Sequence, residues 1–444
     1  MTPAIVGMTA SRRVTVAAPA LFRRGAPGGI LFTMRRTSLP AAGRLASHAA
    51  SRLIATLLVV IAAGCGAQGA AVPDATGGTA RQDARHATAS DTSFAGLVAR
   101  LSEPGGYFDT DNLVSNEASY LHAIGALRAL GVRGGAFVGV GPDQNFSYIA
   151  AVRPRIAFMV DLRRDNLLEH LLLKAIFERA ESRADYLALL FGRPAPRPAS
   201  EWRDRSLLEI VEYLDATPAL PDTAADTRAQ VLKVVRTFGV PLSQADLSTI
   251  DRFHASFIAA GLDLRFTSLN RPSRSYYPTY RQLLLERDLD GNQASFLVTE
   301  DAFRFVQQMQ RHDRVIPVVG DLAGEHALRE IGRLLRERGE RLSAFYASNV
   351  EYYLMRDGSF ERFVANLAAL PRTPSSAIIR SCFGWTCGPA HPETVPSYYS
   401  TQLVQTIGSL VDEQARGGYR TYADVVSKHV VSGRSTSGSV VAPE

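Results

Sequence analysis

A pair of glycines and an acidic residue are spaced along the chain in a way that could bind a nucleotide. Gly139 and Gly141 follow a short apolar run, and Asp161 ends the next apolar run, 22 residues after Gly139. In nucleotide-binding α/β folds the glycine turn lets a ligand approach the backbone, and the acid accepts hydrogen bonds from ribose hydroxyls. The pattern predicts a nucleoside site. The alternatives are structural: a tight turn, and an Asp161 that caps a helix or pairs with Arg163 or Arg164.

Only a parallel sheet would bring these residues together. Short apolar segments alternate with helical patterns, which predicts an α/β fold: a Rossmann-like, mostly parallel sheet with helices on both faces. From about 194 to 295, helical segments broken by prolines predict a largely helical insertion. The expected strands are 135–141, 156–161, 314–321, 342–349 and 376–381. One helix is expected to end near residue 130, and five more are expected at 142–152, 166–191, 328–338, 360–370 and 402–415.

The ordered motifs resemble those of class I S-adenosylmethionine-dependent methyltransferases. Val138-Gly139-Val140-Gly141 is similar to their first motif and Asp161 to their ribose-binding acid. Val319-Gly320-Asp321 is similar to their third-strand motif, whose acid lies near the adenine, and 345–351 stands where their fourth strand opens toward the substrate. The resemblance covers about 111 to 381 and implies S-adenosylmethionine as cofactor. The chain departs from the family at Phe137, where an acid is usual.

The resemblance also implies roles for individual residues. Gly139, Gly141, Asp161, Asp321 and Asn116 are expected to bind the cofactor, and Tyr346, Asn349 and Glu351 to hold or deprotonate a methyl acceptor.

Each of these roles has a structural alternative. Asn116 belongs to a polar cluster (Asn112, Ser115, Asn116, Glu117) that would lie beside the cofactor or cap a helix. Asp321 could cap the helix that follows it, and the segment 348–351 could form a turn. His122 and His170 lie on apolar helical patterns and are expected to be packed rather than catalytic.

A dinucleotide fits the sequence less well. Gln144 stands where the dinucleotide fingerprint needs a third small residue for close packing around a pyrophosphate. S-adenosylmethionine has no pyrophosphate, so this requirement disappears and a dehydrogenase is disfavoured. The chain contains no GxSxG elbow, P-loop or HExxH motif, and a hydrolase therefore lacks a recognisable set of catalytic residues.

The positive charge of the chain is confined to its N-terminus. Residues 1–64 hold eight arginines and no acidic residue, and the rest of the chain has 41 basic against 43 acidic residues, a net charge of −2. A nucleic-acid partner therefore loses its main electrostatic support. The arginines precede an apolar run, 53–64, that is too short to span a bilayer, as in a secretory signal.

Small residues followed by Cys65 end this run and resemble the bacterial lipoprotein box, in which the cysteine is lipidated. Residues 1–64 are thus expected to be a signal segment; Met34 would be a natural start, which leaves 1–33 as a candidate over-extension. Residues 65–92 read as a flexible tether, 93–430 as the folded domain and 431–444 as a disordered tail. The expected location is the cell envelope: lipid-anchored to the membrane and facing the periplasm.

The two remaining cysteines, Cys382 and Cys387, form an even pair that could make a disulfide in an oxidising compartment. Free thiols are the alternative. A metal site is disfavoured, because one nearby histidine, His391, supplies too few ligands.

Two functions follow from these observations. One is a methyltransferase, which works mainly by positioning the acceptor. The other is a non-catalytic envelope lipoprotein that uses the same fold to bind a different small molecule or a partner, since S-adenosylmethionine is made in the cytosol and fold does not fix function.

Overall fold

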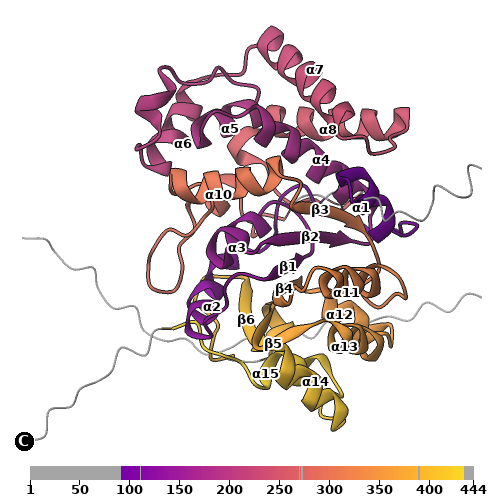
Figure 1. The fold of residues 1–444 in the computed structure, drawn as a ribbon. Coiled ribbons are helices and arrows are strands. Elements are labelled where there is room, and N and C mark those ends of the chain that lie inside the picture. Colours follow the sequence, from indigo (N-terminus) through magenta and orange to yellow (C-terminus); the bar gives the residue numbers. More distant parts are fainter. Residues whose placement is uncertain (1–91, 111, 270, 272–273, 389–390, 435–444) are drawn as a thin grey trace, which may run out of the picture. The chain divides into compact units, whose positions relative to one another are not determined.

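The computed structural model describes residues 92–434 except 111, 270, 272–273 and 389–390. These residues form an α/β fold with a six-stranded, mostly parallel sheet and helices on both faces, which confirms the predicted Rossmann-like class (Figure 1). No helix in this described part of the chain is long and apolar enough to cross a bilayer.

The sheet has the strand order β3-β2-β1-β4-β5-β6. All neighbouring strands are parallel except β5 and β6, which are antiparallel. The order reverses between β1 and β4, so the crossovers that leave these two strands run to opposite sides, which is where α/β folds bind ligands. The strands are β1 (Ala136–Gly139), β2 (Ile156–Asp161), β3 (Val315–Val319), β4 (Leu342–Ser348), β5 (Arg372–Phe383) and β6 (Ser400–Thr406).

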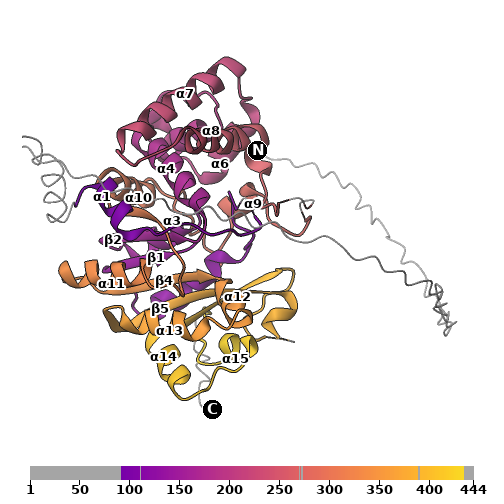
Figure 2. The same ribbon diagram turned by 90° about the vertical axis from the view of Figure 1, so that its right-hand side faces the viewer.

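Helices cover the two faces in the order that the crossovers dictate (Figures 1 and 2). Apolar residues fill β1, β2 and β3 on both faces, as parallel strands between helical layers require. One face carries α3 (Asn145–Val152), α4 (Arg164–Arg179) and α10 (Glu300–Arg311); the other carries α11 (Ala327–Glu337), α12 (Val350–Arg356), α13 (Phe360–Ala369) and α14 (Ile407–Ala415).

A group of extra helices extends the fold between β2 and β3 and packs on α4. The chain passes from α4 to α5 (Arg183–Leu190) and then through the segment where the insertion was expected. That segment contains α6 (Leu207–Ala216), α7 (Pro221–Thr237), α8 (Gln244–Ala260) and α9 (Tyr280–Leu285).

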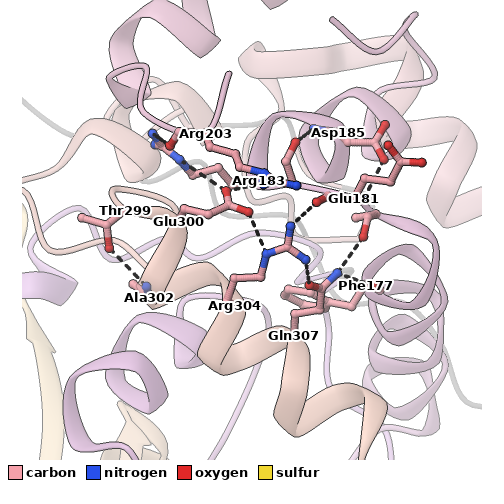
Figure 3. Close-up of polar contacts among 12 residues, drawn as sticks. Phe177, Glu181, Arg183, Asp185, Arg203, Thr299, Glu300, Ala302, Arg304 and Gln307 are labelled. Atoms are coloured by element: carbon pink, nitrogen blue, oxygen red, sulfur yellow. Dashed lines mark hydrogen bonds and ion pairs between the residues drawn. The ribbon is translucent and has the colours of Figure 1, made fainter. Parts of the chain in front are cut away.

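Polar contacts fasten the end of α4 and the start of α5 to α10 and the residues before it (Figure 3). The Gln307 side-chain amide donates to the carbonyls of Phe177 (2.9 Å) and Ala180 (2.7 Å) at the end of α4. The Arg183 guanidinium at the start of α5 donates to the carbonyl of Leu297 (2.8 Å). Arg304 donates to Glu300 (2.8 Å) on its own helix. These contacts have a structural role.

The prediction was wrong at the C-terminal end of the sheet. Residues 402–415 were expected to be one helix, but β6 continues to Thr406 and α14 starts only at Ile407. The free edge of β5 explains the difference, because pairing with it satisfies the backbone of an apolar segment that has no strong period of its own. The expected helix 166–191 is also two helices, α4 and α5, separated at 180–182.

Candidate functional site

A cavity of about 460 Å³ lies over the carboxyl ends of the parallel strands. This volume is within the range of small-molecule sites. Residues that follow β1, β2, β3 and β4 line it, together with the segment 107–117, which precedes the sheet. Among the predicted site residues, the lining includes Gly141, Asp161, Asp321, Asn116 and Asn349; it does not include Gly139, Tyr346 or Glu351.

Strand register explains why these residues meet. Gly139 pairs with Met159 on β2 and with Tyr346 on β4. Gly141, Asp161 and Ser348, each two positions further along, therefore leave the sheet at about the same level. Asp321 lies two positions beyond Val319, the partner of Asp161 in β3. The strand ends thus form one continuous edge.

The turn after β1 needs both glycines, for different reasons. Gly141 has φ +79°, a left-handed conformation that favours glycine, and it lines the cavity. Gly139 lies in the strand, where a Cβ would come within 1.9 Å of the Asn145 side-chain oxygen. Asn145 donates to the carbonyls of Val140 (2.8 Å) and Pro142 (2.8 Å). Gly139 therefore makes room for this amide, and the expectation that it contacts a cofactor is corrected.

His170 fixes the same turn from α4. Its Nε2 lies 2.9 Å from the Gly141 carbonyl oxygen, which accepts the hydrogen bond. Burial lowers the pKa of His170 to about 4, so the ring is neutral at pH 7. His170 is packed in the interior, as predicted, and it also orients the backbone beneath the cavity.

Asp161 forms a bidentate ion pair with Arg163, one of the two structural alternatives considered for it. Its Oδ1 accepts from the Arg163 backbone N–H (2.9 Å) and Nε (3.1 Å), and its Oδ2 accepts from Nη2 (3.0 Å). A carboxylate offers about four lone-pair positions. The contacts within the described part of the chain fill three of them, and one position on Oδ2 has no described partner.

Asp321 and Asn116 lie at the cavity with partners of their own. Asp321 Oδ1 accepts from the backbone N–H of Ala323 (2.9 Å), so it stabilises the turn after β3 rather than the start of α11. Asn116 is half-buried and lies near the hydroxyl of Tyr277, a residue of the predicted insertion.

The most constrained charge in the cavity is Glu117, which is 1% exposed. Its Oε2 accepts from Tyr346 Oη (2.5 Å), from Gln402 Nε2 (2.7 Å) and from the Ser381 hydroxyl; Oε1 accepts from the Ser348 hydroxyl. All four donors are neutral and come from β4, β5 and β6. The Glu117 carboxylate has no ion pair with any residue of the described ranges.

The structure places the three predicted catalytic residues differently. Asn349 lines the cavity, and its side-chain oxygen lies 3.5 Å from Ser348 Oγ, whose proton is donated to Glu117. Tyr346 is fully buried beneath the cavity. Burial is the main cause that raises the pKa of its hydroxyl well above 10, and the charge of Glu117 is the second. Tyr346 therefore positions Glu117 and cannot touch an acceptor in the cavity.

The catalytic role predicted for Glu351 is also wrong. Its side chain is fully buried in an ion pair with Arg380 (Oε2 to Nε, 2.5 Å), which is also fully buried. Arg380 further donates to Gln405 (2.7 Å) and to the carbonyl of Val425 (3.1 Å). The pair links α12, β5 and β6 behind the cavity, and Glu351 has no access to a substrate.

A second buried acid lies next to the turn. Asp143 accepts a short hydrogen bond from Tyr280 on α9, and burial raises the pKa of Asp143 to about 6. Sequence reasoning missed this pair, as it missed Arg163 as a lining residue and the partners of Glu117. Ser381 and Gln402 lie 264 and 285 residues from Glu117, so no local signal links them.

Cys382 and Cys387 are joined by a disulfide at the end of β5, with Cα atoms 5.1 Å apart. Cys65, the predicted lipidation site, lies outside the described residues. Within those residues no group of three His, Cys, Asp or Glu side chains could hold a metal ion.

The fold and the cavity define a Rossmann-like α/β protein with a small-molecule-sized site at the reversal of its strand order. The chain belongs to the family described as a domain of unknown function, DUF7790, which matches residues 113–197 and 259–434. The interval between the two matched stretches corresponds to α6, α7 and α8, so the matched part comprises the sheet and most of the cavity. A comparison with curated proteins finds no match.

We expect Glu351→Gln to destabilise the fold without changing ligand affinity of the folded protein. Removing one charge leaves Arg380 buried and unpaired, which costs about 3–5 kcal/mol of unfolding free energy. Urea denaturation measures this loss, and the double variant Glu351→Leu/Arg380→Met should recover most of it. A folded Glu351→Gln protein of wild-type stability would contradict the structural role.

We expect the contribution of Asp143 to stability to fall as the pH rises from about 4 to about 6, because Asp143 ionises in a buried place. This contribution is read as the difference in unfolding free energy between the wild type and Asp143→Asn, in which the opposite effect of the buried neutral His170 cancels. The pKa of Asp143 is raised in the folded state, so the contribution is complete below the unfolded value and lost above about 6. The loss is at most about 3 kcal/mol. Asp143→Asn keeps an acceptor for Tyr280 and should remove this pH dependence, whereas exposed Asp357→Asn should keep it. Parallel urea-denaturation profiles for wild type and Asp143→Asn would contradict this.

Proposed function

We propose that this chain binds S-adenosylmethionine in the cavity and is a protein of the class I methyltransferase type. The observation that carries the proposal is the convergence of Gly141, Asp161 and Asp321 on one cavity. These residues follow three neighbouring parallel strands, and they are the positions to which the resemblance gives contacts with a nucleoside.

The length of the cavity along the strand ends supports a ligand that consists of a nucleoside and an amino-acid arm. The cavity crosses the ends of four adjacent strands, β3 to β4. Three spacings of about 4.8 Å give a length of roughly 14 Å. An adenosine with an amino-acid arm is elongated in the same way. Phe108 and Tyr353, which meet edge to face at 5.0 Å, add an aromatic wall against which part of the ligand can pack.

Gln144 supports a nucleoside over a dinucleotide. It occupies the position where a third glycine would allow a pyrophosphate to approach the helix, and its side chain lines the cavity. Its Nε2 donates to Tyr346 Oη at 3.3 Å, which holds the amide over the start of α3. A pyrophosphate would have to displace it.

The second candidate function is non-catalytic binding, and one observation favours it. Two of the three residues proposed as catalytic, Tyr346 and Glu351, are buried in structural contacts, which leaves Asn349 at the cavity. Asn349 has no ionisable group and cannot act as a general base. A binding protein for S-adenosylmethionine or a related nucleoside would need only the cavity.

We also propose that the protein is exported and lipid-anchored through Cys65. The support is the arginine-flanked apolar run that ends at this cysteine. Cys65→Ser should move the protein expressed in a Gram-negative bacterium from the membrane fraction to the soluble fraction, and abolish labelling by an alkynyl fatty acid. Equal labelling of the two proteins would contradict the anchor.

Calorimetric titration of the purified domain, residues 92–444, with S-adenosylmethionine tests the binding proposal. We expect a one-to-one complex, weakened tenfold or more by Asp161→Asn, because a ribose hydroxyl loses its charged acceptor. Asp165→Asn, four residues away and outside the cavity lining, is the matched control and should bind as the wild type does. No heat of binding by the wild type at millimolar ligand would end the proposal.

A further inference from the structure

The buried carboxylate of Glu117 accepts four hydrogen bonds and has no counter-ion among the residues that the structure describes. Burying an ionised carboxylate is costly, and hydrogen bonds from neutral groups offset only part of this cost. Cavities that hold such a group attract an opposite charge, because the low dielectric strengthens the attraction.

The positively charged residues of the cavity lining belong to other partners. Arg163 pairs with Asp161 at the end of β2, and Arg362 donates to the carbonyl of Ala323 (3.3 Å) in the turn after β3. Glu117 lies on the other side of the strand-order reversal, held by β4, β5 and β6. At the β2 and β3 end, the acids Asp161 and Asp321 are therefore matched in number by Arg163 and Arg362, whereas Glu117 at the other end has no cation among the described lining residues.

Gln144 gives a second, independent observation at the same end. Its Oε1 is buried and has no hydrogen-bond partner in the part of the chain that the structure describes, while its Nε2 donates to Tyr346, the residue that holds Glu117. A buried acceptor without a donor is costly and rare. A ligand that brings both a positive charge and N–H donors would satisfy both residues.

We infer that Glu117 binds the cationic centre of the ligand and so fixes its direction in the cavity, with the charged arm toward β4 and the nucleoside toward β2 and β3. This inference rests on the proposed function and adds to it, because it assigns the positive charge to a residue outside the motifs of the sequence. Phe137 stands where the resembled family usually has an acid. Glu117, which lies in a segment that precedes the sheet, would supply the negative charge that is absent there.

A series of three ligands tests the inference on the unaltered domain. S-adenosylmethionine carries a sulfonium and an ammonium, S-adenosylhomocysteine only the ammonium, and its deaminated analogue neither. We expect at least one of the two steps to weaken binding tenfold or more; the step that does so identifies the cation that Glu117 holds. Binding of all three within threefold would overturn the inference and leave the proposed nucleoside site intact.

The same series with Glu117→Gln assigns the effect to the residue. The variant should bind the deaminated analogue, which keeps only its carboxylate charge, at least as tightly as the wild type does, and it should lose the tenfold step. Asp357→Asn is the matched control, because Asp357 is an exposed acid of the same cavity lining and its charge is screened by water. A step that survives in folded Glu117→Gln would overturn the assignment, and equal loss in Asp357→Asn would show a general field instead.

If Glu117→Gln does not fold, Ser348→Ala removes one donor from the carboxylate and leaves its charge in place. It should make the step larger, because the carboxylate charge is then less satisfied by neutral donors, whereas a step of wild-type size would overturn the assignment to Glu117. Should no nucleoside bind, the proposed function fails, and S-methylmethionine then tests the cation site alone. If Glu117 binds a cation, S-methylmethionine should bind to the wild type and not to Glu117→Gln. Any other result would overturn the inference as well as the proposed function.

Discussion

One buried carboxylate connects the segment that precedes the sheet to the last three strands of the sheet. Glu117 comes from a segment that precedes the sheet, and its donors come from β4, β5 and β6, the last strands of the chain. Because an unsatisfied carboxylate is so costly to bury, these four hydrogen bonds have to form together, and the segment 107–117 is thereby fixed over the strand ends. The cavity exists because this segment forms one of its walls.

The register of the parallel strands supplies the other constraint. Gly141, Asp161 and Ser348 leave β1, β2 and β4 at one level, so the backbone turn, the Asp161–Arg163 pair and the Glu117 cluster lie along one edge. His170 and Asn145 hold the carbonyls of the glycine turn from below, which leaves the upper side to the cavity. Charge is thus distributed unevenly along a site whose shape suits an elongated ligand. The proposed cationic nucleoside matches that distribution.

Much of the fold could be predicted from the sequence because the signals were local. The β2 segment, 156–161, is continuously apolar and ends on an acid, and its limits agree with the structure. The same local reasoning failed at β6, where pairing with β5 outweighs a weak helical pattern, and at Glu351, which a motif places near a substrate but which Arg380 holds in the interior. The partners of Glu117 lie hundreds of residues away, so no spacing in the sequence could reveal them. The polar cluster 112–117 was visible from its composition, but only the tertiary structure shows which of its members is buried.

A crystal structure of the domain with bound S-adenosylmethionine would show directly whether the ligand lies along this edge and in which direction. We expect ligand density along the edge from β3 to β4, with a ribose hydroxyl within hydrogen-bond distance of Asp161 and the sulfonium or the ammonium next to the Glu117 carboxylate. A ligand bound in the opposite direction, with its charged arm toward Asp321, or bound outside the cavity, would contradict this expectation.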